Sequence, residues 1–190
     1  ITGCFYGTQD FVGTSAGQAD IFVAILDPSG NVVWAQRAGG TENDIGYDII
    51  IDKYKYISIT GRIEGTATFG SPGLWYGTLT SSGGSDIFVA NYDPCGSLDW
   101  DLASVWRAGG AGHDEGLSIT TDGSRNRIAT GFFQETATFD TISLSSVSSP
   151  YLCNVFIAKY DLDGNVLWAK RAGGTGDAVS ENIASDEVGN

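Results

Sequence analysis

The feature that most constrains this chain is a repeat that occurs three times along its 190 residues. The run Asp-Ile-Phe-Val-Ala at 20–24 returns at 86–90 and, as Asn-Val-Phe-Ile-Ala, at 154–158, so the period is 66 and then 68 residues. A spacing of seven residues from Asp to Trp is also shared, at Asp27 and Trp34, Asp93 and Trp100, and Asp161 and Trp168. A fixed period of this kind is typical of solenoids and propellers.

Each copy contains four strand-like runs, in which apolar residues alternate or form a short run bounded by turn residues. We label these runs A to D: strand C is the repeated run, and strand D carries the tryptophan. Strand A is expected near 47–51, 117–120 and 182–185, and strand B near 56–62, 128–133 and 1–6. The turns DPSGN, DPCGS and DLDGN predict C–D hairpins, because Asp caps its own turn and Gly accepts a positive φ.

These runs predict an all-β protein, a β-propeller with three four-stranded antiparallel blades. The copies span approximately 1–58, 59–128 and 129–190, in strand order B-C-D-A. Because three blades are fewer than the usual four to eight, we expect further blades from the same parent chain or from another copy. The chain lacks an initiator methionine and starts inside a strand-like run, so we also expect it to be a mature or internal piece of a longer product. In the second copy, residues 101–106 lengthen the step from Trp100 to Arg107 to seven residues instead of three, which predicts a bulge or an altered outer strand.

Charge and hydropathy exclude several classes of partner. Ten Lys and Arg against 23 Asp and Glu give a net charge of −13, which repels phosphate backbones and anionic membranes. We therefore expect no nucleic acid partner. No apolar run approaches the ~20 residues that span a bilayer, so we expect no membrane insertion. The three cysteines, Cys4, Cys95 and Cys153, are too few for a disulfide framework.

Two stretches of the chain resemble a known repeat. DIFVAILDPSGNVVWAQRAGG at 20–40 and ITGRIEGTATFG at 59–70, with their counterparts in the other two copies, are similar to the bacterial β-propeller repeat called SBBP. The resemblance covers nearly the whole chain. It implies a propeller within a large secreted or surface-attached bacterial protein, and it supplies no catalytic residue.

The connections from D to A and from B to C are expected to share one rim of the propeller, where recognition residues tend to lie. The D–A connections are acidic, and we expect their carboxylates mainly to cap turns and to pair with Arg37, Arg107 and Arg171. The B–C connections differ in length between copies. Our candidate ligand-binding residues on this rim are Trp75, Tyr76, Asp44, His113, Asp114 and Asp177. The repeated tryptophans are better explained by packing between blades.

Metal binding and catalysis have weaker support. Asp161 and Asp163 alternate as carboxylates in a Ca²⁺ loop do, but the other two copies have proline between these positions, so an ordinary turn is the favoured interpretation and we expect no cofactor. His113 is the only histidine, and no GxSxG-type nucleophile motif accompanies it. We therefore expect no catalytic residue and no enzyme activity.

The favoured hypothesis is a non-catalytic structural or adhesive propeller segment, secreted or at the cell surface, that binds a protein or glycan through its rim loops. One alternative is a polysaccharide-acting enzyme that uses rim carboxylates. Another is a self-assembling unit, in which two copies complete a six-bladed ring.

Overall fold

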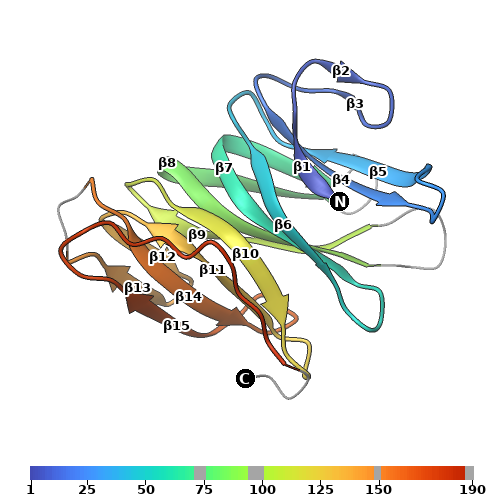
Figure 1. Ribbon diagram of the computed structural model, residues 1–190. Coiled ribbons are helices and arrows are strands. Elements are labelled where there is room, and N and C mark those ends of the chain that lie inside the picture. Colours follow the sequence, from blue (N-terminus) through green and yellow to red (C-terminus); the bar gives the residue numbers. More distant parts are fainter. Residues whose placement is uncertain (71–75, 94–100, 148–150, 187–190) are drawn as a thin grey trace.

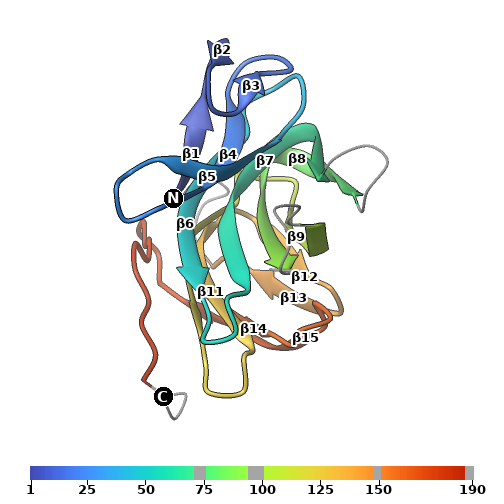
Figure 2. The same ribbon diagram turned by 90° about the vertical axis from the view of Figure 1, so that its right-hand side faces the viewer.

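The computed structural model describes residues 1–70, 76–93, 101–147 and 151–186 (Figure 1). Within them the protein is built from antiparallel strands, and the all-β prediction is confirmed. The described residues include no helix long and apolar enough to cross a membrane. Figures 1 and 2 show the sheets stacked in chain order, with the N-terminal strands at one end and the C-terminal strands at the other.

Three sheet units carry the three repeats. The first unit has strand order β1-β4-β5, the second contains β6, β7, β8 and β9 as sequential neighbours, and the third has order β10-β11-β14-β15. The strands of the first unit are β1 (Thr2–Phe5), β4 (Asp20–Leu26) and β5 (Val32–Ala38). Those of the second are β6 (Ile45–Ile51), β7 (Ile57–Gly70), β8 (Tyr76–Asp93) and β9 (Asp101–Gly110). Those of the third are β10 (Glu115–Thr121), β11 (Arg127–Phe133), β14 (Asn154–Tyr160) and β15 (Val166–Ala172).

The B–C connections form hairpins rather than irregular loops, which the sequence analysis did not anticipate. In the first unit the hairpin is β2 (Thr8–Gln9) with β3 (Gly13–Thr14), and in the third it is β12 (Thr136–Phe139) with β13 (Ile142–Ser145). In the second unit the outer parts of β7 and β8 pair with each other. Hydroxyl pairs join the two strands of each hairpin, at Thr8 and Thr14, Thr66 and Thr80, and Thr136 and Ser145.

Each of the later two hairpins reaches across to the unit before it. Gly39, at the end of β5, and Thr68, in β7, exchange two backbone hydrogen bonds of 3.0 Å. In the same way, Gly109 and Gly110 of β9 pair with Thr138 and Ala137 of β12. Gly39 and Gly109 have φ values of 147° and 150°, which side-chain-bearing residues rarely adopt. These bridges join the outer edges of neighbouring units.

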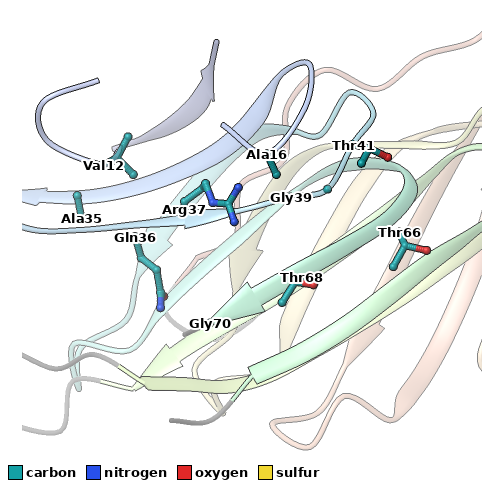
Figure 3. Close-up of a pocket in the computed structure, with 11 residues that line it drawn as sticks. Val12, Ala16, Ala35, Gln36, Arg37, Gly39, Thr41, Thr66, Thr68 and Gly70 are labelled. Atoms are coloured by element: carbon teal, nitrogen blue, oxygen red, sulfur yellow. The ribbon is translucent and has the colours of Figure 1, made fainter. Parts of the chain in front are cut away.

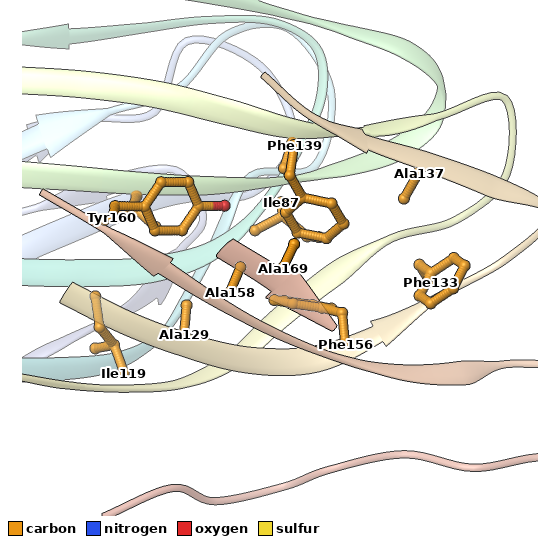
Figure 4. Packing of buried hydrophobic residues seen from close by; sticks show 12 residues of the cluster. Ile87, Ile119, Ala129, Phe133, Ala137, Phe139, Phe156, Ala158, Tyr160 and Ala169 are labelled. Carbon is orange, nitrogen blue, oxygen red and sulfur yellow. The ribbon is translucent and has the colours of Figure 1, made fainter. Parts of the chain in front are cut away.

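The hydrophobic core lies between the units, in two seams. At the first seam Ile21 and Val23 of β4 pack in a buried cluster with residues of the second unit, among them Ile59, Phe69 and Phe88. The second seam repeats this arrangement between the second and third units (Figure 4), with a buried cluster containing Ile87, Val89, Ile119, Ala129, Phe133, Ala137, Phe139, Phe156, Ala158 and Tyr160. Each sheet therefore hides its apolar faces against its neighbours.

The tryptophans follow the repeat only in part. Trp34 packs edge-on against Tyr92 across the first seam, with ring centroids 5.8 Å apart. Across the second seam, Trp106 packs against Tyr160 at 5.5 Å, although the repeat predicted Trp100 for this role. Trp100 lies outside the described residues. Residues 101–106 continue strand β9, and its ladder with β8 shifts register between Asn91 and Tyr92. A register shift at the equivalent position of the ladder between strands C and D occurs in all three units.

A buried cation distinguishes the second seam. Arg127 is fully buried, and its Nε donates to Asn91 Oδ1 at 3.3 Å and also to Ser58. Asp52, which accepts a 2.8 Å bond from Arg125 Nε, lies 3.8 Å from an Arg127 nitrogen. Ile57 stands at the equivalent place in the second unit and belongs to the apolar cluster of the first seam.

The predicted strand at 182–185 is absent. This segment is extended beside β10 and is held by side chains: Ile183 N donates to Ser118 Oγ at 3.3 Å, and Ser185 Oγ donates to the carbonyl of Thr121 at 2.7 Å. No strand lies on its other side within the described residues, so it has no ladder in which to take part. The prediction was wrong because the alternation of residues 182–185 says nothing about a partner strand.

The fold predicts unequal effects for two repeat-equivalent phenylalanines. Phe69→Ala should lower the free energy of unfolding by about 3–5 kcal/mol, because its ring is fully buried at the first seam. Phe11→Ala, at the equivalent place in the first unit but 39% exposed, should lower it by less than half as much. Urea unfolding of both variants measures the difference, and equal losses would contradict this account of the seams.

Candidate functional site

The rim formed by the D–A loops and the B–C hairpins is present at the first seam. Gln18, which follows the first hairpin, donates to Glu42 Oε2 at 3.1 Å and accepts from Asn43 Nδ2 at 3.0 Å. At the second seam, the backbone N–H of His113 donates to Gln134 Oε1 at 3.2 Å. The two kinds of connection therefore lie together, as the sequence analysis predicted.

A cleft of about 700 Å³ opens on this rim, between the first and second units (Figure 3). One wall is the outer part of β5, and the other is the outer part of β7. The loop that carries Val12 and Ala16 closes one side. The lining residues are Val12, Ala16, Ala35, Gln36, Arg37, Gly39, Gly40, Thr41, Thr66, Thr68 and Gly70.

The β5 wall of the cleft is the outer edge of the first sheet, as far as the described residues show. On its inner side β5 pairs with β4 from Val32 to Ala38, and its outer side has no strand partner in the described residues before the bridge at Gly39. The bridge shows that this edge accepts a strand, and beyond it β5 and β7 diverge to form the cleft. Unpaired backbone groups at a sheet edge are available to an added strand.

One charged side chain in the cleft is held by an ion pair. Arg37, whose side chain is 35% exposed, lies 2.8 Å from Asp20 Oδ2, and Asp20 is fully buried. Asp20 Oδ2 also accepts from the backbone N–H of Ala16 at 2.8 Å. Arg107 pairs with Asp86 in the same way, while Arg171 donates to Asn154 Oδ1 at 3.2 Å. These arginines therefore bind the first residue of strand C, and not the carboxylates of the D–A loops that the sequence analysis expected.

Two predicted rim residues, Asp44 and Asp114, are buried and serve their own loops. Asp44 accepts from the backbone N–H groups of Gly40 and Glu64 at 2.8 and 3.0 Å. Asp114 accepts from Gly110 and Gln134 at 2.7 and 3.0 Å. Both side chains are fully enclosed, so neither is exposed to contact a partner. This role agrees with the expectation that the carboxylates of the D–A connections mainly cap turns.

Each of these carboxylates lies near a second one. A Cβ atom built on Gly39 would meet both Asp20 and Asp44, and one on Gly109 would meet both Asp86 and Asp114. Burial is the main cause that raises the pKa of Asp44 to about 6 and that of Asp114 to about 7, and the neighbouring aspartates Asp20 and Asp86 make a smaller contribution to these values. The third copy has Asn154 and Ala178 at the equivalent positions. The two acidic residues of the pair are therefore both missing there.

His113 contacts a serine that the sequence analysis did not identify. Ser85 N donates to His113 Nδ1 at 3.3 Å, and Ser85 Oγ lies at the same distance from that nitrogen. The imidazole itself is exposed, but Ser85 is fully buried, so its hydroxyl does not face a substrate. The contact is a structural one between a D–A loop and the start of strand C.

The other predicted site residues are not brought to the cleft. Asp177 is exposed and accepts from the backbone N–H of Cys153 at 2.8 Å, at the far end of the stack. Trp75 lies outside the described residues, and of Tyr76 only the backbone, at the start of β8, is described. Cys4 and Cys153 are free and half-buried, and Cys95 lies outside the described residues.

The Asp161 turn is explained by its own hydrogen bonds. Asp161 Oδ1 accepts from the backbone N–H groups of Asp163 and Asn165, and its Oδ2 accepts from the Asn165 amide at 2.9 Å. Asp27 caps its turn in the same way. Among the described residues no group of three or more His, Cys, Asp and Glu is arranged to hold a metal ion.

Comparison with known proteins gives one informative similarity. No protein-family model matches the chain. The chain is 29% identical over 180 residues to an uncharacterized WD repeat-containing protein, L264, of Acanthamoeba polyphaga mimivirus. The match covers 88% of this chain and 13% of that protein. The chain is thus similar to part of a viral protein whose name records WD repeats, whereas the bacterial SBBP resemblance is not shown by these comparisons.

The buried carboxylates predict an unusual pH dependence. Because the folded pKa values of Asp44 and Asp114 lie above the unfolded value of about 4, these groups favour folding most below pH 4. That contribution is lost as the pH rises from about 4 to about 6–7, on the order of 3 kcal/mol for Asp44 and 4 kcal/mol for Asp114. Urea unfolding between pH 4 and 8 should show this slope in the wild type and a flatter one in the Asp44→Asn, Asp114→Asn double variant. Identical slopes would contradict the assignment.

Proposed function

We propose that this chain is a segment of a β-propeller that serves as a non-catalytic interaction module, and that it binds an extended segment of a partner protein in the cleft beside β5. The observation that carries the proposal is the outer edge of β5, which has no strand partner before Gly39 among the described residues and lines a cleft of about 700 Å³ on the loop rim. In this mode the partner adds a strand, main-chain hydrogen bonds supply affinity and alternate side chains supply specificity.

The propeller part of the proposal is supported by how the repeats pack. Each unit is an antiparallel sheet that buries its faces on its neighbours, and the same outer-edge bridge recurs at both seams. The name of the viral relative records WD repeats, and WD repeats form four-stranded propeller blades. We therefore assign the three sheet units as propeller blades.

The composition of the cleft favours a peptide over a small ligand. Most of its lining residues are glycines, alanines and threonines, which allow close approach of a backbone, and the cation among the described lining residues, Arg37, is already paired with Asp20. The chain as a whole carries −13, so a partner segment of net positive charge is favoured by the long-range field. The buried states of Asp44 and Asp114 support a binding role for this rim rather than acid–base chemistry.

The proposal is tested by filling the cleft. Peptides would be selected from a random displayed library against the wild-type chain, and their affinities measured by calorimetry. Ala16→Trp places an indole in the cleft from an exposed position, so it should weaken binding of the selected peptides at least tenfold. Ser29→Trp is the matched control, because Ser29 is exposed in the C–D turn at the other end of β5. Equal affinities for the two variants would rule out the cleft as the site.

Strand addition is tested separately on the peptide. Methylating alternate backbone nitrogens removes the main-chain donors while keeping the side chains, so affinity should fall at least tenfold in one of the two alternating patterns and less in the other. If both methylated forms bind as well as the parent peptide, the partner does not pair with β5.

A further inference from the structure

At both internal seams a buried aspartate has one oxygen that accepts no hydrogen bond. Asp20 and Asp86, at the start of strand C in their units, are fully buried, and Oδ2 of each pairs with an arginine of strand D. Their Oδ1 atoms are also enclosed and have no hydrogen-bond partner among the described residues. A buried acceptor without a donor costs free energy. The same unsatisfied oxygen at two equivalent positions indicates a common feature of the seams.

A second carboxyl group borders each of these oxygens. A Cβ atom built on Gly39 would lie 2.9 Å from Asp20 Oδ1 and 3.1 Å from Asp44 Oδ2. The same construction on Gly109 meets the two equivalent oxygens of the second seam, both at 2.9 Å. Each glycine therefore leaves a small space that two carboxyl groups share. The two carboxyl pairs are Asp20 with Asp44 and Asp86 with Asp114.

The contacts of each pair indicate which member carries a proton. Asp20 is bound to a guanidinium, which favours its ionised form. Asp44 accepts from the backbone N–H groups of Gly40 and Glu64, and it takes part in no ion pair among the described residues. A protonated carboxyl group has one O–H donor and keeps some of its acceptor capacity. Asp44 Oδ2 can therefore donate to Asp20 Oδ1 and still accept from Gly40.

The charges around Asp44 also favour its neutral form. Burial is the main cause that raises the pKa of Asp44 to about 6, and the negative charges of Asp20 and Glu64 add to it. Both cations at this end of the contacting strands are paired with other acids. The charged groups at the rim end of the strands and loop that contact Asp44 are Asp20, Arg37, Glu42, Arg62 and Glu64.

Asp114 has similar surroundings at the second seam. Burial again is the main cause that raises its pKa, to about 7, with a smaller increase from Asp86 and a decrease from Arg107. The third unit has Asn154 and Ala178 at the equivalent positions, so the two acids of a pair are present together or absent together. The titratable groups at the rim end of the strands and loops around Asp114 are Asp86, Arg107, His113, Glu115, Glu135 and Cys153.

Asp44 also ties together the two segments that the outer-edge bridge joins. It binds Gly40, which follows the bridge residue Gly39, and it binds Glu64 of β7, the strand that carries the other bridge residue, Thr68 (Figure 3). Ionisation of Asp44 would place two negative charges beside one buried space, which burial and like charge both disfavour. Separation of the two carboxylates would weaken these contacts, and with them the bridge.

From this duplicated geometry we propose that each internal seam holds one proton between its two aspartates, and that loss of this proton opens the outer-edge bridge. The proton is the O–H of Asp44 or Asp114, donated to the unsatisfied oxygen of Asp20 or Asp86. The closed form is the protonated one, so the bridge is released as the pH rises through the range in which Asp44 and Asp114 ionise. This device does not depend on a partner in the cleft.

The position of the proton is tested by carbon NMR of the chain labelled in its aspartate carboxyl groups. Asp44 should be neutral at pH 5 and ionised at pH 8, and the resonance of Asp20 should move over the same range because the pair shares one proton. Asp20→Asn removes the neighbouring charge, so the midpoint of Asp44 should fall by about one pH unit or more. An ionised Asp44 at pH 5 in the wild type would overturn the proposal, as would an unchanged midpoint in folded Asp20→Asn.

A metal ion is the competing occupant of the space between the carboxyls. The wild-type titration is repeated at constant ionic strength with calcium chloride and with choline chloride. The midpoints of Asp44 and Asp114 should agree in the two salts, because a shared proton needs no metal. Midpoints lower by about one pH unit or more in calcium would identify a cation site and would overturn the shared proton.

Release of the bridge is tested by hydrogen exchange of the Gly39 and Thr68 amides, each of which donates to the other residue. Their protection factors should fall about tenfold or more between pH 5 and pH 8 in the wild type. Asp44→Asn cannot ionise and keeps an N–H donor for Asp20, so its bridge protection should be the same at both pH values.

The amides of the β4–β5 ladder are the matched control within the same unit, because neither carboxyl of the pair bridges that ladder. Their protection should change less than that of the bridge. Equal losses in ladder and bridge would contradict release of the bridge itself. Constant bridge protection in the wild type, or the same loss in Asp44→Asn as in the wild type, would show that no proton controls it.

Discussion

Burial of both faces of a thin sheet is the constraint on which the rest of this structure depends. A sheet of three or four strands has two sides, and one unit of this protein cannot cover both of its own. The apolar residues of β4 and β5 are buried only because the second unit packs on them, and those of the second unit only because the third packs in turn. The glycine bridges at Gly39 and Gly109 fasten the same seams at their outer edges.

This dependence explains what the sequence could predict. Strand positions follow from alternation within one repeat, so β4, β5, β6, β10, β11 and β14 were placed within a few residues. Features that depend on a neighbouring unit could not be read in this way. The two later hairpins pair with the preceding unit. Trp106 reaches Tyr160 because of the β8–β9 register. Residues 182–185 have no partner strand among the described residues.

The candidate site likewise combines features that the sequence predicted with features that depend on how neighbouring elements pack. Sequence spacing placed the D–A and B–C connections on one rim, but it could not distinguish an exposed carboxylate from a buried one. Asp44 and Asp114 each accept a hydrogen bond from a backbone N–H of their own D–A loop and another from a backbone N–H at the end of the adjacent strand B. Both carboxylates are therefore buried. The cleft beside β5 depends on the divergence of β5 and β7 after their bridge, which no residue pattern records.

The two internal seams are not chemically alike, and the difference bears on how neighbouring units recognise each other. The first seam contains Ile57, whereas the second contains Arg127 with Asn91 and Ser58. A buried arginine is costly unless it has hydrogen-bond partners, so the third unit requires a neighbour that supplies acceptors such as Asn91 and Ser58 to Arg127. At the third-unit face Lys159 takes the place of Asn91 and is held 2.6 Å from Asp122. A neighbour carrying an arginine like Arg127 would meet this cation there.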